Sequence, residues 1–186
     1  MQTVAYLDTV PSPAGPLRFA VHADGALLFV SLLDGHYPFT LEQELTRERY
    51  EIASDPSRTA AVREQLAEYA NGTRQTFDLP VALVGSAWQR EVWTALMNIP
   101  FGETCSYGEL ARAVGQPGSA RAVGRANGSN RIPLVIPCHR VIGVDGTLTG
   151  FGGGLHLKTR LLAHEARVLG RPIDTPHQQR QLTLAL

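Results

Sequence analysis

The spacing of the apolar residues changes along this chain, and that change limits its fold more than any other feature. Three short runs, over residues 4–10, 17–22 and 26–32, resemble strands and are separated by proline, glycine and aspartate residues that favour turns. From residue 55 onward, apolar residues recur every three or four positions, which is typical of helices. The pattern predicts an α/β (α+β) chain: a small N-terminal domain with an antiparallel sheet and a helix over 55–72, then a mainly helical C-terminal domain.

We place the two domains at residues 1–80 and 86–170, with a tail over 171–186. Within the second domain, two serines are predicted to begin helices. Ser86 and Ser106 each stand three positions before a glutamine or glutamate, which is the spacing of a capping box. The residues after each serine continue in an apolar pattern with helical spacing.

Residues 106–127 fit a helix-turn-helix, two short helices joined by a tight turn. Gly115 is placed to end the first helix, and Ser119 is placed to cap the second, over 120–127. An ordinary helical hairpin would give the same pattern, so the sequence leaves both interpretations open. A last helix is expected over 155–168.

Composition excludes several classes of protein. No apolar run is long enough to span a bilayer, and the N-terminus lacks the basic start and apolar core of a secretory signal. The two cysteines are too few for a disulfide framework, and a chain of 186 residues can bury a core without one. We therefore expect a soluble cytoplasmic protein with two free thiols and no membrane partner.

The net charge of zero conceals a division along the chain. Residues 1–87 hold six basic and eleven acidic side chains, whereas residues 88–171 hold ten basic and five acidic ones. Five arginines of the second part follow one another with no aspartate or glutamate between them: Arg112, Arg121, Arg125, Arg131 and Arg140. Such a tract can hold a polyanion, because phosphate attraction acts over roughly 10 Å. A solvated basic face is the plainer interpretation.

Residues 132–137 form an apolar run whose two prolines exclude a helix interior, so we expect a buried extended segment. It leads to Cys138, a candidate nucleophile, and to His139, a candidate base. Neighbouring side chains of an extended segment point to opposite faces, so a bridging water is the natural link between the two. Glu165 is a candidate for orienting the imidazole. A buried structural thiol remains the alternative. A metal site is not expected, because the histidines and the two cysteines lack the spacing of zinc ligands.

Several motifs occur together in a fixed order. The run IPCHRV, over residues 136–141, resembles the active-site signature of the O6-alkylguanine-DNA alkyltransferases, also called methylated-DNA–protein-cysteine methyltransferases. Further matches to this family, in order and spacing, are Ser106-Tyr107, ARAVG over 120–124, Asn130 and LLAHE over 161–165. The match covers about residues 86–168.

The resemblance implies repair of DNA by direct reversal. Members of the family bind duplex DNA with their helix-turn-helix, from the minor groove, and flip an alkylated guanine out of the stack. They transfer the alkyl group from guanine O6 to a cysteine irreversibly, once per molecule, and O4-alkylthymine is a further candidate substrate. The implied partner is double-stranded DNA containing alkylated guanine. No cofactor and no metal are expected, and a monomer is expected.

Carried over to this chain, the family's chemical roles fall on five residues. Cys138 is the expected alkyl acceptor, and His139, acting through a water, generates the thiolate together with Glu165. Asn130 is expected to brace this network. Tyr107 is expected to push the target nucleotide outward and to help protonate guanine, which is a poor leaving group as an anion.

The remaining roles concern DNA and the pocket for the flipped base. Arg121 is expected to enter the duplex and fill the space that the base leaves. The face toward the minor groove is expected to hold Ala120, Ala122, Gly124 and Tyr107. The substrate pocket is expected to hold Val141, Pro133, Phe151 and Gly152. Backbone carbonyls of Cys138 and Val141 are expected to recognise the guanine amino group.

Two pocket positions depart from the family pattern. Phe151 stands where many members have tyrosine, so one hydroxyl is missing. Gly152 stands where some members have serine, so contact with the alkylated oxygen must come from a backbone N–H there. The loop over residues 150–154 is rich in glycine, which favours a wider or softer pocket for larger alkyl groups.

Other functions would use parts of the same pattern. A sensor that binds alkylated DNA without transfer would lack the acceptor cysteine, so Cys138 argues for transfer. A thiol hydrolase would need an oxyanion hole and a cleft for a peptide or ester, which nothing in the sequence indicates. A transcription factor of this family would carry a further metal-binding segment, of which the sequence shows no sign.

Overall fold

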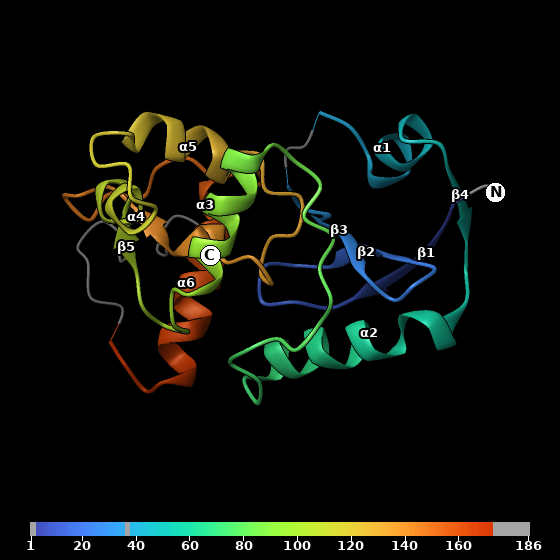
Figure 1. The fold of residues 1–186 in the computed structure, drawn as a ribbon. Helices are drawn as coiled ribbons and strands as arrows, with labels where there is room; N and C mark the ends of the chain where they lie inside the picture. The colour runs from blue at the N-terminus through green and yellow to red at the C-terminus, as the bar shows by residue number, and fades with distance from the viewer. Residues whose placement is uncertain (1–2, 36–37, 173–186) are drawn as a thin grey trace. The chain divides into compact units, whose positions relative to one another are not determined.

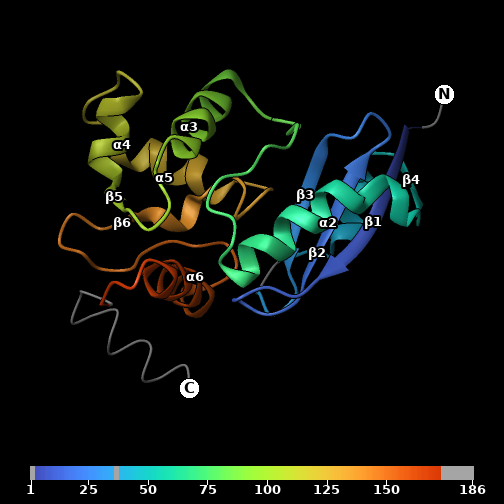
Figure 2. The same cartoon turned by 90° about the horizontal axis from the view of Figure 1, so that it is seen from below.

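The computed structural model describes residues 3–35 and 38–172, and Figures 1 and 2 show it from two sides. The chain divides into two compact units, Met1–Leu83 and Val84–Leu186. Helices and strands occur together along the chain, which confirms the predicted α/β class. No helix in these ranges is both long enough and apolar enough to cross a membrane. The predicted tail lies outside the described residues from 173 onward.

The first unit is built on a four-stranded sheet with the order β3-β2-β1-β4. Its strands are β1 (Thr3–Val10), β2 (Leu17–His22), β3 (Leu27–Leu32) and β4 (Tyr50–Ala53). The first three pair antiparallel, as the apolar runs predict. The fourth, which the sequence did not predict, pairs in parallel with β1 and adds a parallel edge to the antiparallel sheet. β4 escapes prediction because it has only four residues and exposes its central two.

Two helices cover opposite faces of this sheet (Figure 1). α1 (Leu41–Arg47), which the sequence pattern does not predict, packs its two buried leucines in a cluster with Leu7 of β1. α2 (Pro56–Asn71) confirms the helix predicted for this region, and its Thr59 donates to Asp8 of β1 at 2.6 Å. Successive side chains of a strand point to opposite faces, so the two helices lie on different sides of β1.

The second unit is mainly helical. Its elements follow in the order α3 (Ala87–Met97), β5 (Cys105–Ser106), α4 (Tyr107–Ala113), α5 (Ala120–Gly128), the 3₁₀ helix η1 (Cys138–Arg140), β6 (Val141–Ile142) and α6 (Leu155–Val168). α4 and α5 pack against each other across the turn that joins them, as a helix-turn-helix requires, and α3 packs against α5 (Figure 1). β5 pairs in parallel with β6, so the start of α4 lies beside the end of η1.

Both predicted capping boxes are present. Ser86 and Ser106 each accept a hydrogen bond from the backbone N–H three residues on, and the side-chain oxygens of Gln89 and Glu109 accept one from the backbone N–H of the serine. Ser119 makes no side-chain cap hydrogen bond, so that prediction is wrong. Its backbone, at φ −87° and ψ 23°, lies close to the helical region, whereas a capping serine needs an extended backbone to turn its hydroxyl toward the helix.

The apolar run over residues 132–137 is buried, as predicted, but it is not extended. Its backbone turns, because the Ile136 N–H bonds the carbonyl of Ile132 at 2.9 Å and the Cys138 N–H bonds that of Ile136 at 2.8 Å. Leu134 adopts the left-handed region at φ 73°, a strained conformation that complete burial of its side chain holds in place. The run leads into η1, so the extended geometry expected for the Cys-His pair is also wrong.

The contrast between Ser106 and Ser119 gives a test of helix capping. Ser106→Ala removes the acceptor for the Glu109 N–H, and we expect a loss of about 1 kcal/mol in the free energy of unfolding. Ser119→Ala removes no cap bond and should change that free energy by less than about 0.5 kcal/mol. Urea titrations followed by circular dichroism measure both variants. Equal losses would contradict the difference between the two caps.

Candidate functional site

Cys138, the first residue of η1, lies almost entirely inside the second unit, with 5% of its surface exposed. Burial raises the pKa of its thiol to about 11, so the sulfur is protonated at neutral pH. A hydrogen bond with the Asn130 side chain and the charge of Lys158 act in the opposite direction. The site therefore holds a protonated thiol together with two groups that favour its thiolate.

Asn130 fixes the loop that leads to Cys138. Its Nδ2 donates to the carbonyl of Ile136 at 2.8 Å, and its Oδ1 accepts from the N–H of Ile132 at 2.9 Å. These bonds satisfy backbone groups that a turning, buried segment could not pair by itself. Asn127 of α5, which the sequence did not single out, adds a longer bond of 3.4 Å to the carbonyl of Cys138.

His139 and Glu165 meet in the interior, although they come from η1 and α6. Nε2 of the imidazole lies 2.9 Å from Oε1 of the carboxylate, and both side chains are fully buried. Burial lowers the pKa of His139 in spite of the carboxylate, which raises it, so the ring is neutral with its proton on Nε2. The second nitrogen, Nδ1, is then an acceptor, and within the described residues it has no hydrogen-bond partner. It is free to receive a proton.

Arg140 completes this arrangement, and sequence reasoning did not identify it as a site residue. Its Nε and Nη2 donate to the carboxylate of Glu165 at 2.9–3.3 Å, and its Nη1 donates to the carbonyl of Ile99 at 2.6 Å. The N–H of Gly102 adds a further bond to Glu165 at 2.8 Å. Burial would raise the pKa of Glu165, but His139 and Arg140 outweigh it and hold that pKa well below its usual range. A solvated basic face is therefore the wrong interpretation for buried Arg140.

Lys158 of α6 is a second residue that sequence reasoning missed. Its side chain is fully buried, and its Nζ donates to the carbonyls of Val141 at 2.5 Å and Thr149 at 2.7 Å. Burial lowers its pKa to about 8, and the nearby Cys138 thiolate opposes that effect. A lysine within a helical pattern gives no signal that its amine points inward. The Val141 carbonyl, expected to recognise guanine, thus already accepts one hydrogen bond.

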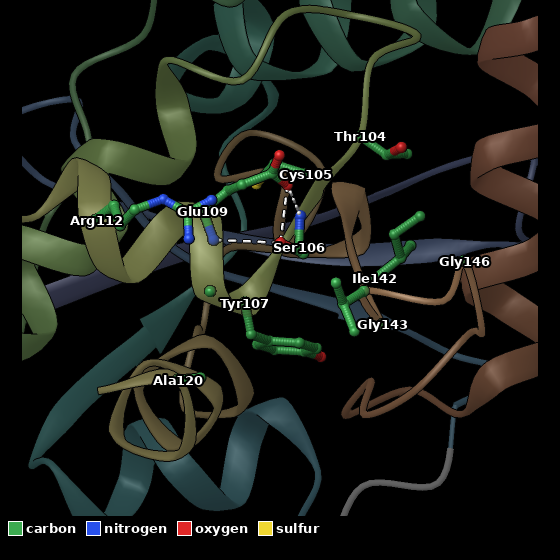
Figure 3. A pocket seen from close by; sticks show the side chains of 12 residues that line it. Thr104, Cys105, Ser106, Tyr107, Glu109, Arg112, Ala120, Ile142, Gly143 and Gly146 are labelled. Atoms are coloured by element: carbon green, nitrogen blue, oxygen red, sulfur yellow. Dashed lines mark hydrogen bonds between the residues drawn. The ribbon is translucent and has the colours of Figure 1, made fainter. Parts of the chain in front are cut away.

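Tyr107 stands at the start of α4, and its hydroxyl donates to the carbonyl of Thr149 at 3.1 Å. Its ring packs on Gly124 of α5, where a Cβ would lie 3.7 Å from the ring. Tyr107 and Ala120, which stands at the other end of the small-residue face, line the same cavity (Figure 3). The remaining residues of α5 that are expected to meet DNA are exposed or half-buried: Arg121 and Ala122.

The four residues expected to line a substrate pocket differ in exposure. Val141 and Pro133 are buried, Phe151 is half-buried and Gly152 is exposed. The structure brings four of the expected chemical residues together directly: Cys138, His139, Glu165 and Asn130. Tyr107 is connected to this cluster through the Thr149 carbonyl, which it shares with Lys158. Across the ranges that the structure describes, no group of three or more His, Cys, Asp or Glu residues could hold a metal ion.

Comparison with known proteins gives consistent matches. A family model described as 6-O-methylguanine DNA methyltransferase, DNA binding domain, matches residues 87–167. A methylated-DNA–protein-cysteine methyltransferase of Mycolicibacterium paratuberculosis is 48% identical over 159 residues, which cover 86% of this chain and 91% of that protein. One of Shigella flexneri is 42% identical over 173 residues, which cover 87% and 96%. The crystal structure of Mycobacterium tuberculosis OGT in complex with DNA matches with a TM-score of 0.77 at 39% identity, covering 95% of this chain and 98% of that one.

The buried charges predict a specific pattern of stability. Glu165→Gln leaves Arg140 buried without its counter-charge, and we expect a loss of about 3–5 kcal/mol in the free energy of unfolding. The double variant with Arg140→Met should recover most of this loss. Because the folded pKa of Glu165 is depressed, its stabilising effect is present at pH 7 and shrinks as the pH falls below the ordinary carboxyl value of 4.5. Urea titrations at several pH values measure these changes.

An exposed ion pair of the same type supplies the control. Glu103 and Arg171 lie 2.6 Å apart with both side chains 51% exposed, so Glu103→Gln should cost less than about 1 kcal/mol. If Glu165→Gln costs no more than Glu103→Gln, the buried pair does not hold the site together.

Proposed function

This chain belongs to the family of methylated-DNA–protein-cysteine methyltransferases, and we propose that Cys138 is the residue that accepts the alkyl group. The protein repairs DNA by direct reversal of alkylation. One observation carries the assignment of the acceptor. Cys138 precedes His139, whose ring Glu165 orients, within the region that matches the family's DNA binding domain.

The transfer is a substitution at the alkyl carbon of an O6-alkylguanine. The Cys138 thiolate forms the new S–C bond while the C–O6 bond breaks, and the bonding electron pair passes to guanine. Guanine then takes up one proton, so a thiol and an alkylated base become a thioether and unmodified guanine. Because a thioether is a stable product, each molecule reacts once.

The buried network supplies the thiolate. Nδ1 of His139 accepts the thiol proton through a water, and the ionised Glu165 stabilises the imidazolium that forms. Lys158 and Asn130 stabilise the negative sulfur, because each lowers the pKa of Cys138. These attractions are strong in a buried site, where little water screens them.

DNA is the partner of the second unit, and we assign an alkylated guanine in duplex DNA as its substrate. Arg121 is exposed on α5 and able to fill the gap that a flipped base leaves. Burial raises the pKa of Tyr107, which keeps its hydroxyl protonated as a donor for the departing guanine. That hydroxyl must turn away from the Thr149 carbonyl to reach a base.

A sensor that only binds alkylated DNA is not favoured, because the homologues named as methyltransferases align with most of this chain and Cys138 is in place. Each of the residues assigned to the chemistry belongs to the second unit of one chain, so we propose that the monomer is active. The cytoplasmic location stays a prediction from the sequence.

Intact-protein mass spectrometry tests the transfer. After mixing with a short duplex that contains O6-methylguanine, the wild-type chain should gain the mass of one methyl group and saturate at one per molecule. Cys138→Ala should bind the same duplex with no gain in mass. Binding by the wild type without any mass change would point to a damage sensor instead.

The pH dependence of transfer tests Lys158. Lys158→Met removes a positive charge near the sulfur, so the Cys138 pKa should rise and the single-turnover rate at pH 7 should fall by about tenfold for each unit of that rise. The pKa of Lys158 is about 8, so the wild type loses this assistance as the pH climbs above 8, and the two pH–rate profiles should converge there. Lys158→Arg keeps a charge and should retain part of the rate. An equal loss at every pH would mean that Lys158 only supports the loop.

A further inference from the structure

A cavity of about 530 Å³ opens on the side of Tyr107 that faces β5 and β6 (Figure 3). Its walls come from the start of α4, from Ala120 at the start of α5 and from the turn after β6. Neither Cys138 nor His139 lines it. The cavity is therefore separate from the reacting sulfur, but it shares Tyr107 with the path by which a nucleotide must enter.

Arg112 lines this cavity from the last turn of α4. Its side chain is exposed and makes no hydrogen bond among the residues that the structure describes, although its charge acts on Glu109 three positions earlier in the helix. A guanidinium in this state is available to a phosphate, which it can bind with two parallel hydrogen bonds. Among the five arginines of the basic tract, Arg112 and Arg125 each line a cavity, whereas Arg140 is buried against Glu165.

Glu109 also lines the cavity, and its charge would oppose an anion. Its carboxylate is turned to Ser106, from which it accepts the backbone N–H at 2.7 Å and the hydroxyl at 2.8 Å (Figure 3). The N–H and the hydroxyl of Ser106 offset much of the negative potential of the Glu109 carboxylate. The two Ser106 donors, followed by the charge of Arg112, hold the pKa of Glu109 below its usual value, and the N–H groups of the Arg112 guanidinium have no hydrogen-bond partner within the described residues.

The opposite wall is a rigid turn with an apolar tip. The N–H of Gly143 bonds the carbonyl of Thr147 at 2.8 Å, and Asp145 accepts from both the N–H and the hydroxyl of Thr147. A Cβ at Gly143 would come within 2.6 Å of the Thr147 and Asp145 side-chain oxygens, so a larger residue there would have to push these side chains aside. Val144 stands at its tip with 93% of its surface exposed. An ordered turn that presents an apolar side chain to solvent suits contact with a carbon-rich surface.

We propose that this cavity holds the sugar-phosphate backbone of the lesion-bearing DNA strand beside the flipped nucleotide, with a phosphate on Arg112 and a deoxyribose against Val144. The proposal rests on the proposed function and names a contact for the strand outside α5. Tyr107 selects the strand, because the nucleotide that it displaces stays joined to its neighbours by phosphates. The Arg112 guanidinium on one wall matches the phosphate of the backbone, and the apolar Val144 side chain on the other wall matches the deoxyribose.

Equilibrium binding tests this contact, with Cys138→Ala as the background so that transfer does not consume the complex. Arg112→Ala should weaken binding of a lesion duplex by about three- to tenfold at low salt and reduce the slope of log K against log salt by about 1. Val144→Asp should weaken binding similarly, because it sets a carboxylate against the backbone. Arg167→Ala removes the same charge from the far end of α6 and should bind like the parent (Figure 1).

The phosphate that Arg112 binds can be located by replacing the phosphates of the duplex, one at a time, with uncharged methylphosphonates. A methylphosphonate next to the alkylated guanine on the lesion strand should weaken binding by the Cys138→Ala parent. It should not weaken binding further when Arg112→Ala is added. The proposal is overturned if both cavity variants bind like the parent, or if the phosphate that Arg112 senses lies on the complementary strand.

Reaction with free O6-benzylguanine, which involves no DNA, separates this proposal from the proposed function. Arg112→Ala and Val144→Asp with Cys138 intact should react with the free base at the wild-type rate. If wild-type Cys138 gains an alkyl group neither from the free base nor from the duplex, the proposed function fails, whatever the binding data show.

Discussion

The carboxylate of Glu165 is the interaction on which the rest of the site depends. It joins three segments that are far apart in the sequence: α6, the 3₁₀ helix η1 and the connection that follows α3. His139, Arg140 and the N–H of Gly102 all donate to it in the interior. A buried carboxylate with fewer donors would be protonated, and it could then neither orient the imidazole nor balance the arginine. The position of the Cys138 sulfur, the proposed acceptor, follows because Cys138 immediately precedes the two residues that this carboxylate holds.

Burial has two opposite effects on the proposed reaction centre around Cys138. It raises the pKa of Cys138, so the thiol is protected while no substrate is bound. It also strengthens every attraction between charges in the same space, because water is excluded. The attraction between the Lys158 ammonium group and a negative Cys138 sulfur is strengthened in this way. The ammonium group is held by two backbone carbonyls, so its charge is not cancelled by a carboxylate in the described part of the chain and can act on the sulfur.

Much of the fold follows from local sequence signals, and much of the site does not. The capping boxes at Ser86 and Ser106 and the strands β1 to β3 were predictable because a few neighbouring residues determine them. The parallel strand β4 was not, because it is short and depends on its partner. The Cys-His pair marked Cys138 as a candidate nucleophile, and both its chemistry and the family resemblance pointed to Glu165 as the partner of His139. Arg140 and Lys158 gave no such signal, since a charged side chain reveals its burial only through contacts distant in sequence.

The pairing of Arg140 with Glu165 also restricts how a chain of this kind can change over generations. Each charge is tolerated in the interior only because the other is present. A lineage that replaces one of them must pass through a protein with an unpaired buried ion before it can replace the second. His139 narrows the choice further, since it uses the same carboxylate. Substitutions at these positions should therefore occur together or not at all, whereas an exposed pair such as Arg171 with Glu103 can be lost one side chain at a time.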